Sequence, residues 1–266
     1  MSRAPQNRID ATFARLKREQ KKAFITYIMA GDTSLERTKE QVLLLERCGV
    51  DIVELGVPFS DPVADGPTIQ RAAERALASG TALRHVLSLV KELRTVTQIP
   101  IVLMTYYNII FKYGEQQFVA DALEAGVDGV ILPDLPPDEA SAFISYAKTG
   151  GKGKKLATIF LVAPTSTEDR VKKIVSASSG FVYYVSMTGI TGTALHVDES
   201  FARHVQSVRE RSRKPVAVGF GVSSAQDARM MREVADGVIV GSALVRTFHE
   251  RPDAAEAFIR ELREAI

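Results

Sequence analysis

The hydrophobic positions along the chain fall into two kinds of stretch, short apolar runs and longer segments with one apolar face. Residues 7–20 place Ile9, Phe13 and Leu16 at helical spacing, which predicts an amphipathic helix. Residues 24–30 follow as an apolar run of strand length. The same succession continues along the chain, and alternating strands and helices are typical of an α/β fold.

A short unit occurs three times, at 49–54, 126–134 and 235–241. Each copy runs from the end of a helix through an Asp into a strand that is rich in Val and Ile. Repeated units of this kind predict parallel strands that are joined by helical crossovers.

Eight strands are expected in total, and helical segments such as 68–97 and 137–148 separate them. The expected strands are 24–30, 51–55, 100–105, 128–132, 155–162, 180–185, 215–219 and 236–240. Eight such units favour a closed (β/α)8 barrel, the TIM-barrel class, over an open doubly wound sheet. The extra helix at 7–20 would close the bottom of this barrel. No interior linker interrupts the pattern, so we expect 1–266 to form a single domain.

Composition and charge exclude several classes of function. The formal net charge is +2 over 266 residues, which gives no reason to expect a nucleic-acid or membrane partner. Cys48 is the only cysteine, so the chain has no intramolecular disulfide, and the four histidines lack metal-ligand spacing. We therefore expect no metal site. Residues 1–8 are polar and lack the apolar core of a signal peptide, so a cytoplasmic location is expected.

The stretch that is richest in candidate chemistry is Glu54-Leu-Gly-Val-Pro-Phe-Ser-Asp-Pro-Val-Ala-Asp65-Gly-Pro67. Glu54 ends an apolar strand, where a carboxylate is costly unless it is paired or used. Desolvation there would favour the protonated acid, which suits proton transfer near neutral pH. Asp65 lies on the following loop and is placed to bind a polar donor of a substrate. Asp61 and Asp134 are weaker candidates, and an ordinary surface loop with solvated acids is the alternative.

Glycine-rich loops follow the last three expected strands, at 188–192, 219–221 and 241–242. Glycines let backbone N–H groups approach an anion, and the start of a helix adds a favourable dipole. Barrels often bind phosphate at the loops after strands seven and eight. These loops contain no Lys or Arg, so backbone amides and Ser242 would carry the binding. The alternative is that the glycines only permit tight turns.

A few apolar and aromatic residues are candidates for a pocket wall. Tyr183 and Tyr184 must point to opposite faces of their strand, one toward the barrel interior and the other toward the helices. Phe24, Ile69 and Leu132 are further candidates, with core packing as the alternative for each.

Together these motifs resemble the tryptophan synthase alpha chain family over nearly the whole length of the chain. The 54–67 stretch is the most specific match. The supporting motifs are Tyr107-Asn108, Leu132-Pro-Asp-Leu-Pro136, Gly189-Ile-Thr-Gly192, Gly219-Phe-Gly221 and Gly241-Ser-Ala243.

The resemblance implies a retro-aldol cleavage of indole-3-glycerol phosphate to indole and D-glyceraldehyde 3-phosphate, without a cofactor in this chain. It implies that Glu54 is the general acid–base residue, that Asp65 binds the indole N–H, and that Tyr183 lies near the substrate. The substrate-binding residues that it implies are Phe24 in the indole pocket, Thr191 in the loop after strand six, and Gly192, Gly221, Gly241 and Ser242 at the phosphate.

The resemblance also implies a partner, the beta chain, which receives the indole and carries pyridoxal phosphate. Pro58, Asp61 and Asn108 match the surface that contacts this partner, and the resemblance implies an assembly of two alpha and two beta chains (α2β2).

Three other functions remain open at this point. A barrel of the same phosphate-binding group could catalyse another reaction, such as isomerisation of an aminosugar phosphate, but it need not keep both Glu54 and Asp65. A stand-alone indole-releasing lyase would keep the same motifs. A non-catalytic regulatory subunit should have lost an acid–base residue, and this chain keeps both.

Overall fold

The structure is a computed structural model that describes residues 7–151, 153–185, 199–219 and 221–266. It contains nine strands: β1 Ala23–Met29, β2 Ile52–Gly56, β3 Ile101–Met104, β4 Gly129–Ile131, β5 Ala157–Ile159, β6 Leu161–Val162, β7 Val182–Val185, β8 Val216–Gly219 and β9 Gly237–Val240. The helices are α1 Arg8–Arg18, α2 Leu35–Arg47, α3 Pro67–Ala78, α4 Leu83–Leu93, α5 Tyr107–Tyr113, α6 Glu115–Ala125, α7 Ser141–Thr149, α8 Glu168–Ala177, α9 Glu199–Arg211, α10 Ala225–Val234, α11 Ser242–Glu250, the 3-10 turn η1 Pro252–Ala254, and α12 Ala255–Ala265.

The strands form one parallel sheet in the order β5-β4-β3-β2-β1-β9-β8-β7-β6. The two ends of this order, β5 and β6, are separated only by Phe160. The backbone N–H of Tyr183 donates to the Phe160 carbonyl at 3.1 Å. The sheet therefore curls round until its two ends meet on one chain segment, and the expected barrel class is confirmed.

Two expected elements are divided in the structure. The single strand expected at 155–162 is two short strands, because β5 pairs with β4 while β6 pairs with β7. The helix expected at 68–97 is α3 followed by α4, because Gly80 has a φ of +78° and ends the first helix in a turn. The expectation of one domain over 1–266 stays a prediction.

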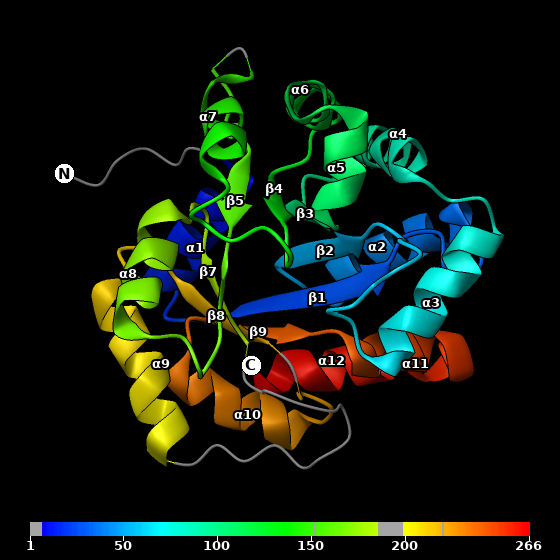
Figure 1. Cartoon of the computed structure of the whole chain (residues 1–266). Helices are drawn as coiled ribbons and strands as arrows, with labels where there is room; N and C mark the ends of the chain where they lie inside the picture. The colour runs from blue at the N-terminus through cyan, green and yellow to red at the C-terminus, as the bar shows by residue number, and fades with distance from the viewer. Residues whose placement is uncertain (1–6, 152, 186–198, 220) are drawn as a thin grey trace.

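Helices surround the sheet, and α3 and α11 pack side by side (Figure 1). This contact matters because α3 follows the loop that carries Asp65, whereas α11 begins directly after Gly241. Two loops that are far apart in the sequence are thereby brought to the same end of the barrel.

The N-terminal helix closes the opposite end, as expected. Ile9, Phe13 and Leu16 belong to the same buried cluster as the inward residues of the strands. The rings of Phe13 and Phe181 lie 5.9 Å apart. This apolar layer fills the N-terminal end of the barrel interior, and the cavity that matters for function opens at the carboxyl ends of the strands.

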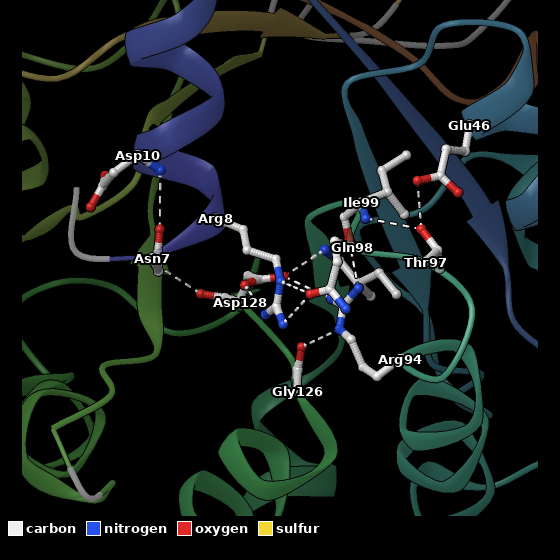
Figure 2. A network of polar contacts seen from close by, with 11 residues as sticks. Asn7, Arg8, Asp10, Glu46, Arg94, Thr97, Gln98, Ile99, Gly126 and Asp128 are labelled. Carbon is white, nitrogen blue, oxygen red and sulfur yellow. Dashed lines mark hydrogen bonds and ion pairs between the residues drawn. The ribbon is translucent and has the colours of Figure 1, made fainter.

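The repeated Asp of the sequence has a structural role at this closed end. In each copy the carboxylate accepts a backbone N–H at the first or second residue of a neighbouring strand at 3.0 Å, with Asp51 bound to Phe24, Asp128 to Ile101 and Asp236 to Val216. Each carboxylate also pairs with arginine. Figure 2 shows Arg8 and Arg94 meeting at Asp128, at 3.0 and 2.8 Å. The repeated Asp thus fixes strand starts and takes no part in the candidate site.

Candidate active site

A cavity of about 650 Å³ opens at the carboxyl ends of the strands. Its wall combines inward residues of the sheet with the loops after β2, β8 and β9. The residues of this wall that bear on the argument are Tyr27, Asp65, Met104, Tyr183, Gly221, Gly241, Ser242 and Arg246. A mostly apolar cavity with a few converging polar groups is the usual form of a small-molecule site.

Glu54 lies on β2, in register with Tyr27 of β1, and is completely buried. Neither of its carboxylate oxygens has a hydrogen-bond partner among the described residues. Burial raises the pKa of Glu54 to about 8, because the charged form loses its hydration. A carboxyl group with such a pKa can both accept and donate a proton near neutral pH.

Asp65 is held in the loop after β2 by Tyr106, which precedes α5. The Tyr106 hydroxyl lies 3.2 Å from Oδ2 of Asp65, and the Ala64 N–H donates to the same hydroxyl at 2.9 Å. Desolvation raises the pKa of Asp65 to about 6, and the hydrogen bond from Tyr106 partly opposes this shift. Asp65 is therefore ionised at pH 7 and faces the cavity as a hydrogen-bond acceptor.

Two tyrosine hydroxyls lie where neighbouring strands carry glycine. A Cβ atom at Gly56 would lie 2.0 Å from the Tyr27 hydroxyl, and one at Gly219 would lie 2.4 Å from the Tyr183 hydroxyl. The charges of Glu54 and Asp65 both contribute to raising the pKa of Tyr27 and of Tyr183, after desolvation. The two carboxyl groups and the two hydroxyls thus share one part of the barrel interior.

The other end of the cavity has the features of an anion site. Gly221 has a φ of +83°, a conformation that favours glycine. No side chain caps the first turn of α11, which starts at Gly241 and Ser242. Backbone donors at a helix start attract anions. Arg246, one turn further along α11, also lines the cavity and adds a positive charge.

The structure moves one expected residue out of the site. Phe24 is completely buried in the cluster between sheet and helices, with the Arg263 guanidinium 5.6 Å from its ring centre. The expectation that Phe24 lines an indole pocket is therefore wrong. Side chains alternate along β1, and Tyr27, three residues further on, is the one that faces inward. Leu132 also belongs to this outer cluster, whereas Ile69 lines the cavity.

The remaining expected residues are distributed as follows. Tyr183 faces the cavity and Tyr184 packs outward, with its hydroxyl 2.8 Å from Nδ1 of His204. Asp134 accepts the Tyr107 N–H at the start of α5 through both carboxylate oxygens. Thr191 and Gly192 lie outside the described residues.

Among the residues expected at a partner interface, Asp61 and Asn108 are exposed, whereas Pro58 is buried.

Sequence reasoning missed Tyr27 and Arg246 as members of the site, and it placed Tyr106 only at the end of a strand. Tyr27 follows from the alternation of β1 once one inward residue is known. Arg246 is four residues after Ser242, so helical spacing places it on the same side of α11. The contact of Tyr106 with Asp65 joins two separate loops and has no local signal in the sequence.

Two further searches covered the part of the chain that the structure describes. No group of three or more His, Cys, Asp or Glu side chains there is arranged to hold a metal ion. No helix within that part is long and apolar enough to cross a membrane.

Comparison with known proteins identifies the family. The model of the tryptophan synthase alpha chain family matches residues 13–266. The chain belongs to this family. A tryptophan synthase alpha chain from Geotalea daltonii is 54% identical over 243 residues, which are 91% of this chain and 90% of the relative. One from Geobacter sulfurreducens is 51% identical and covers 98% of this chain and 99% of its own length.

Solved structures agree with the family assignment. The alpha subunit from Legionella pneumophila has a TM-score of 0.88 at 38% identity and covers 98% of each chain. A chain of Mycobacterium tuberculosis tryptophan synthase has a TM-score of 0.90 at 38% identity with the same coverage. Tryptophan synthase alpha chains are lyases of tryptophan biosynthesis that cleave indole-3-glycerol phosphate and pass indole to a beta chain. The expected reaction and the expected kind of partner agree with this assignment.

Proposed function

We propose that Glu54 and Asp65 are the two catalytic carboxyl groups of the alpha reaction in this chain, with Glu54 as the general acid–base residue. The observation that carries the proposal is the buried, unpartnered carboxyl group of Glu54, whose pKa lies at about 8. In the cleavage, the hydroxyl beside the indole ring loses its proton and becomes the aldehyde of glyceraldehyde 3-phosphate. C3 of the indole takes up a proton, which makes the ring a leaving group and puts a positive charge on its nitrogen. The carbon–carbon bond then breaks, and its electron pair returns to the ring and cancels this charge. Glu54 accepts one proton and supplies the other.

Asp65 has a complementary role in this proposal. Its ionised carboxylate accepts a hydrogen bond from the indole N–H and stabilises the positive charge that develops there when C3 is protonated. Tyr183 and Tyr27 line the cavity between this acid and Glu54 and complete the wall around the reacting atoms.

The substrate phosphate would bind at the opposite end of the cavity. Gly221, Gly241 and Ser242 supply close backbone approach and a helix start, and Arg246 supplies charge. Thr191 and Gly192 belong to the proposed site through the family resemblance alone.

We also propose the rim around Pro58, Asp61 and Asn108 as the docking surface for the beta chain. Two large apolar side chains support it, because Val63 and Phe111 on the same two segments are 86% and 68% exposed. Exposed apolar groups of this size are typical of protein interfaces. The proposed assembly is α2β2, with pyridoxal phosphate in the beta chain. The reaction in this chain consists of proton transfers and bond cleavage, so we propose that it needs no cofactor. A cytoplasmic location stays a prediction.

Indole release from indole-3-glycerol phosphate tests the proposed function, with the purified chain alone and with a cognate beta chain. Slow release alone and strong stimulation by the beta chain are expected. Fast release alone would instead indicate a stand-alone lyase. No release under either condition would contradict the proposal.

A second experiment tests the docking surface. Phe111→Ser should weaken the association with the beta chain, measured by sedimentation, and leave release by the isolated chain unchanged. Val96→Ser is the matched control, since Val96 is 60% exposed and follows α4. Equal weakening by both variants would contradict the assigned surface.

A further inference from the structure

The hydroxyl of Tyr27 occupies the position that a side chain at residue 56 would have. Its oxygen lies 2.0 Å from where a Cβ of Gly56 would be. Residues 54 and 56 point to the same side of β2, since side chains alternate along a strand. Same-side positions are separated by about 6.6 Å, at about 3.3 Å per residue. The hydroxyl therefore occupies the next inward position after Glu54 in the direction of the cavity, where a Glu54 side chain extended along β2 would meet it.

Neither group has a hydrogen-bond partner among the described residues. The Tyr27 hydroxyl makes no hydrogen bond with a described residue, although the residue is only 7% exposed. The two oxygens of Glu54 are equally unpartnered among the described residues. Buried tyrosine hydroxyls usually have a partner, and a buried carboxylate needs one when it ionises. Each group could satisfy the other.

We propose that Tyr27 is a positioning residue whose hydroxyl donates a hydrogen bond to Glu54 when this carboxyl group is ionised. Gly56 leaves the space that the hydroxyl needs. The inference rests on the proposed role of Glu54 and adds the group that holds it in its charged state. A hydrogen bond to the charged form lowers a carboxyl pKa, so Tyr27 opposes the effect of burial.

The other ionisable groups around this pair are known from the structure. Asp65 reaches it from the loop after β2, Tyr106 from the start of α5 and Tyr183 from β7, and their charges act on Tyr27 together with that of Glu54. No cation among the described residues contributes to the pKa of Glu54, where burial is the only cause of the shift. A neutral donor is therefore what the ionised carboxylate lacks.

The test is Tyr27→Phe, with the carboxyl carbon of Glu54 followed by ¹³C NMR as a function of pH. Its signal is assigned as the one that Glu54→Gln removes. We expect the pKa of Glu54 to rise by about one unit in Tyr27→Phe, because one hydrogen bond to the charged form is lost. In the pH profile of kcat/KM, the limb that reports the ionisation of Glu54 should move to higher pH by the same amount. Tyr184→Phe, on the outward face of β7, should leave the pKa unchanged.

A second variant keeps the hydroxyl but removes its space. Gly56→Ala would place a methyl group where the hydroxyl lies and displace the hydroxyl. The loss of its hydrogen bond should raise the pKa of Glu54, as in Tyr27→Phe. A Glu54 pKa in Tyr27→Phe within about 0.2 units of the wild-type value would overturn the inference. The NMR titration decides this even if the wild-type chain releases no indole, which would contradict the proposed function separately.

Discussion

The phenolic hydroxyl of Tyr106 lies 3.2 Å from Oδ2 of Asp65 and joins the loop after β2 to the start of α5. The same hydroxyl accepts the Ala64 N–H at 2.9 Å, so one oxygen holds two consecutive residues of the loop. Asp134 in turn holds the first N–H of α5. Loops that follow three neighbouring strands are thus tied together around the carboxylate that is proposed to bind the indole.

Tyr106→Phe should weaken catalysis by removing this tie. The hydrogen bond from Tyr106 lowers the pKa of Asp65, so its loss should raise that pKa above about 6. Since the ionised form is the active one, the acid limb of kcat/KM should move to higher pH. We expect kcat/KM at pH 7 to fall about three- to tenfold.

Tyr113→Phe is the matched control for this variant. Its hydroxyl donates to Asp121 at 2.7 Å, so the same type of bond is lost at a site outside the cavity. An unchanged acid limb in Tyr106→Phe, or an equal change in Tyr113→Phe, would contradict the assigned role.

Gly221→Val should chiefly raise the dissociation constant of a phosphate ligand such as glycerol 3-phosphate. The side chain would enter the wall of the cavity at a φ of +83°. Gly153→Val imposes comparable strain at a φ of +80°, in a position with open space around it. Calorimetric titration should show at least tenfold weaker binding by Gly221→Val and unchanged binding by Gly153→Val. Unchanged binding in Gly221→Val would place the phosphate elsewhere.

Arg246→Gln tests the charge at the same end of the cavity. Removal of the cation should weaken the binding of glycerol 3-phosphate about three- to tenfold, and this effect should become smaller at high salt. Indole carries no phosphate, so its binding should not change. Arg251→Gln, at the end of α11, provides the control. If Arg246→Gln weakened the binding of glycerol 3-phosphate and of indole equally, the effect would be a general structural one and not the loss of a phosphate contact.

Glu54→Gln should make the chain more stable, in a pH-dependent way. Between about pH 4.5 and 8 the unfolded chain releases the Glu54 proton while the folded chain retains it, so wild-type stability falls as pH rises through this window. The amide has no such cost. Urea unfolding should show that the free energy of unfolding of Glu54→Gln exceeds that of the wild type by more at pH 8 than at pH 5, and the difference between the two pH values should be at least about 2 kcal/mol. Glu199→Gln, whose side chain is 92% exposed, should show no such trend. A gain that is equal at both pH values would argue against the raised pKa.

Much of the fold follows from local patterns in the sequence. The strands are recognisable because they are short apolar runs between amphipathic helices, and the helix at 8–18 keeps its three apolar residues on one face. The break at Phe160 is not visible in this way, because 155–162 is one apolar run and only strand pairing divides it.

The candidate site was predictable in part for the same physical reason. Glu54 and the loop glycines have strong local context, a carboxylate on a buried strand and tight turns after strands. Tyr27 lines the cavity in place of the expected Phe24, because the face of β1 that carries Tyr27 points inward. The sequence of the strand does not show which face this is, since all of its residues are buried. Arg246 follows from helical spacing once Ser242 is known to line the site. The contact of Tyr106 with Asp65 joins distant segments, and local sequence does not encode it.

The most direct test of the account is indole release by Glu54→Gln in complex with a beta chain, measured in a single turnover with substrate bound. The account predicts that substrate binds with nearly wild-type affinity while release slows by at least about a thousandfold, because no other group in the described part of the chain is placed to move both protons. Release at a rate close to that of the wild type would show that Glu54 is not the acid–base residue.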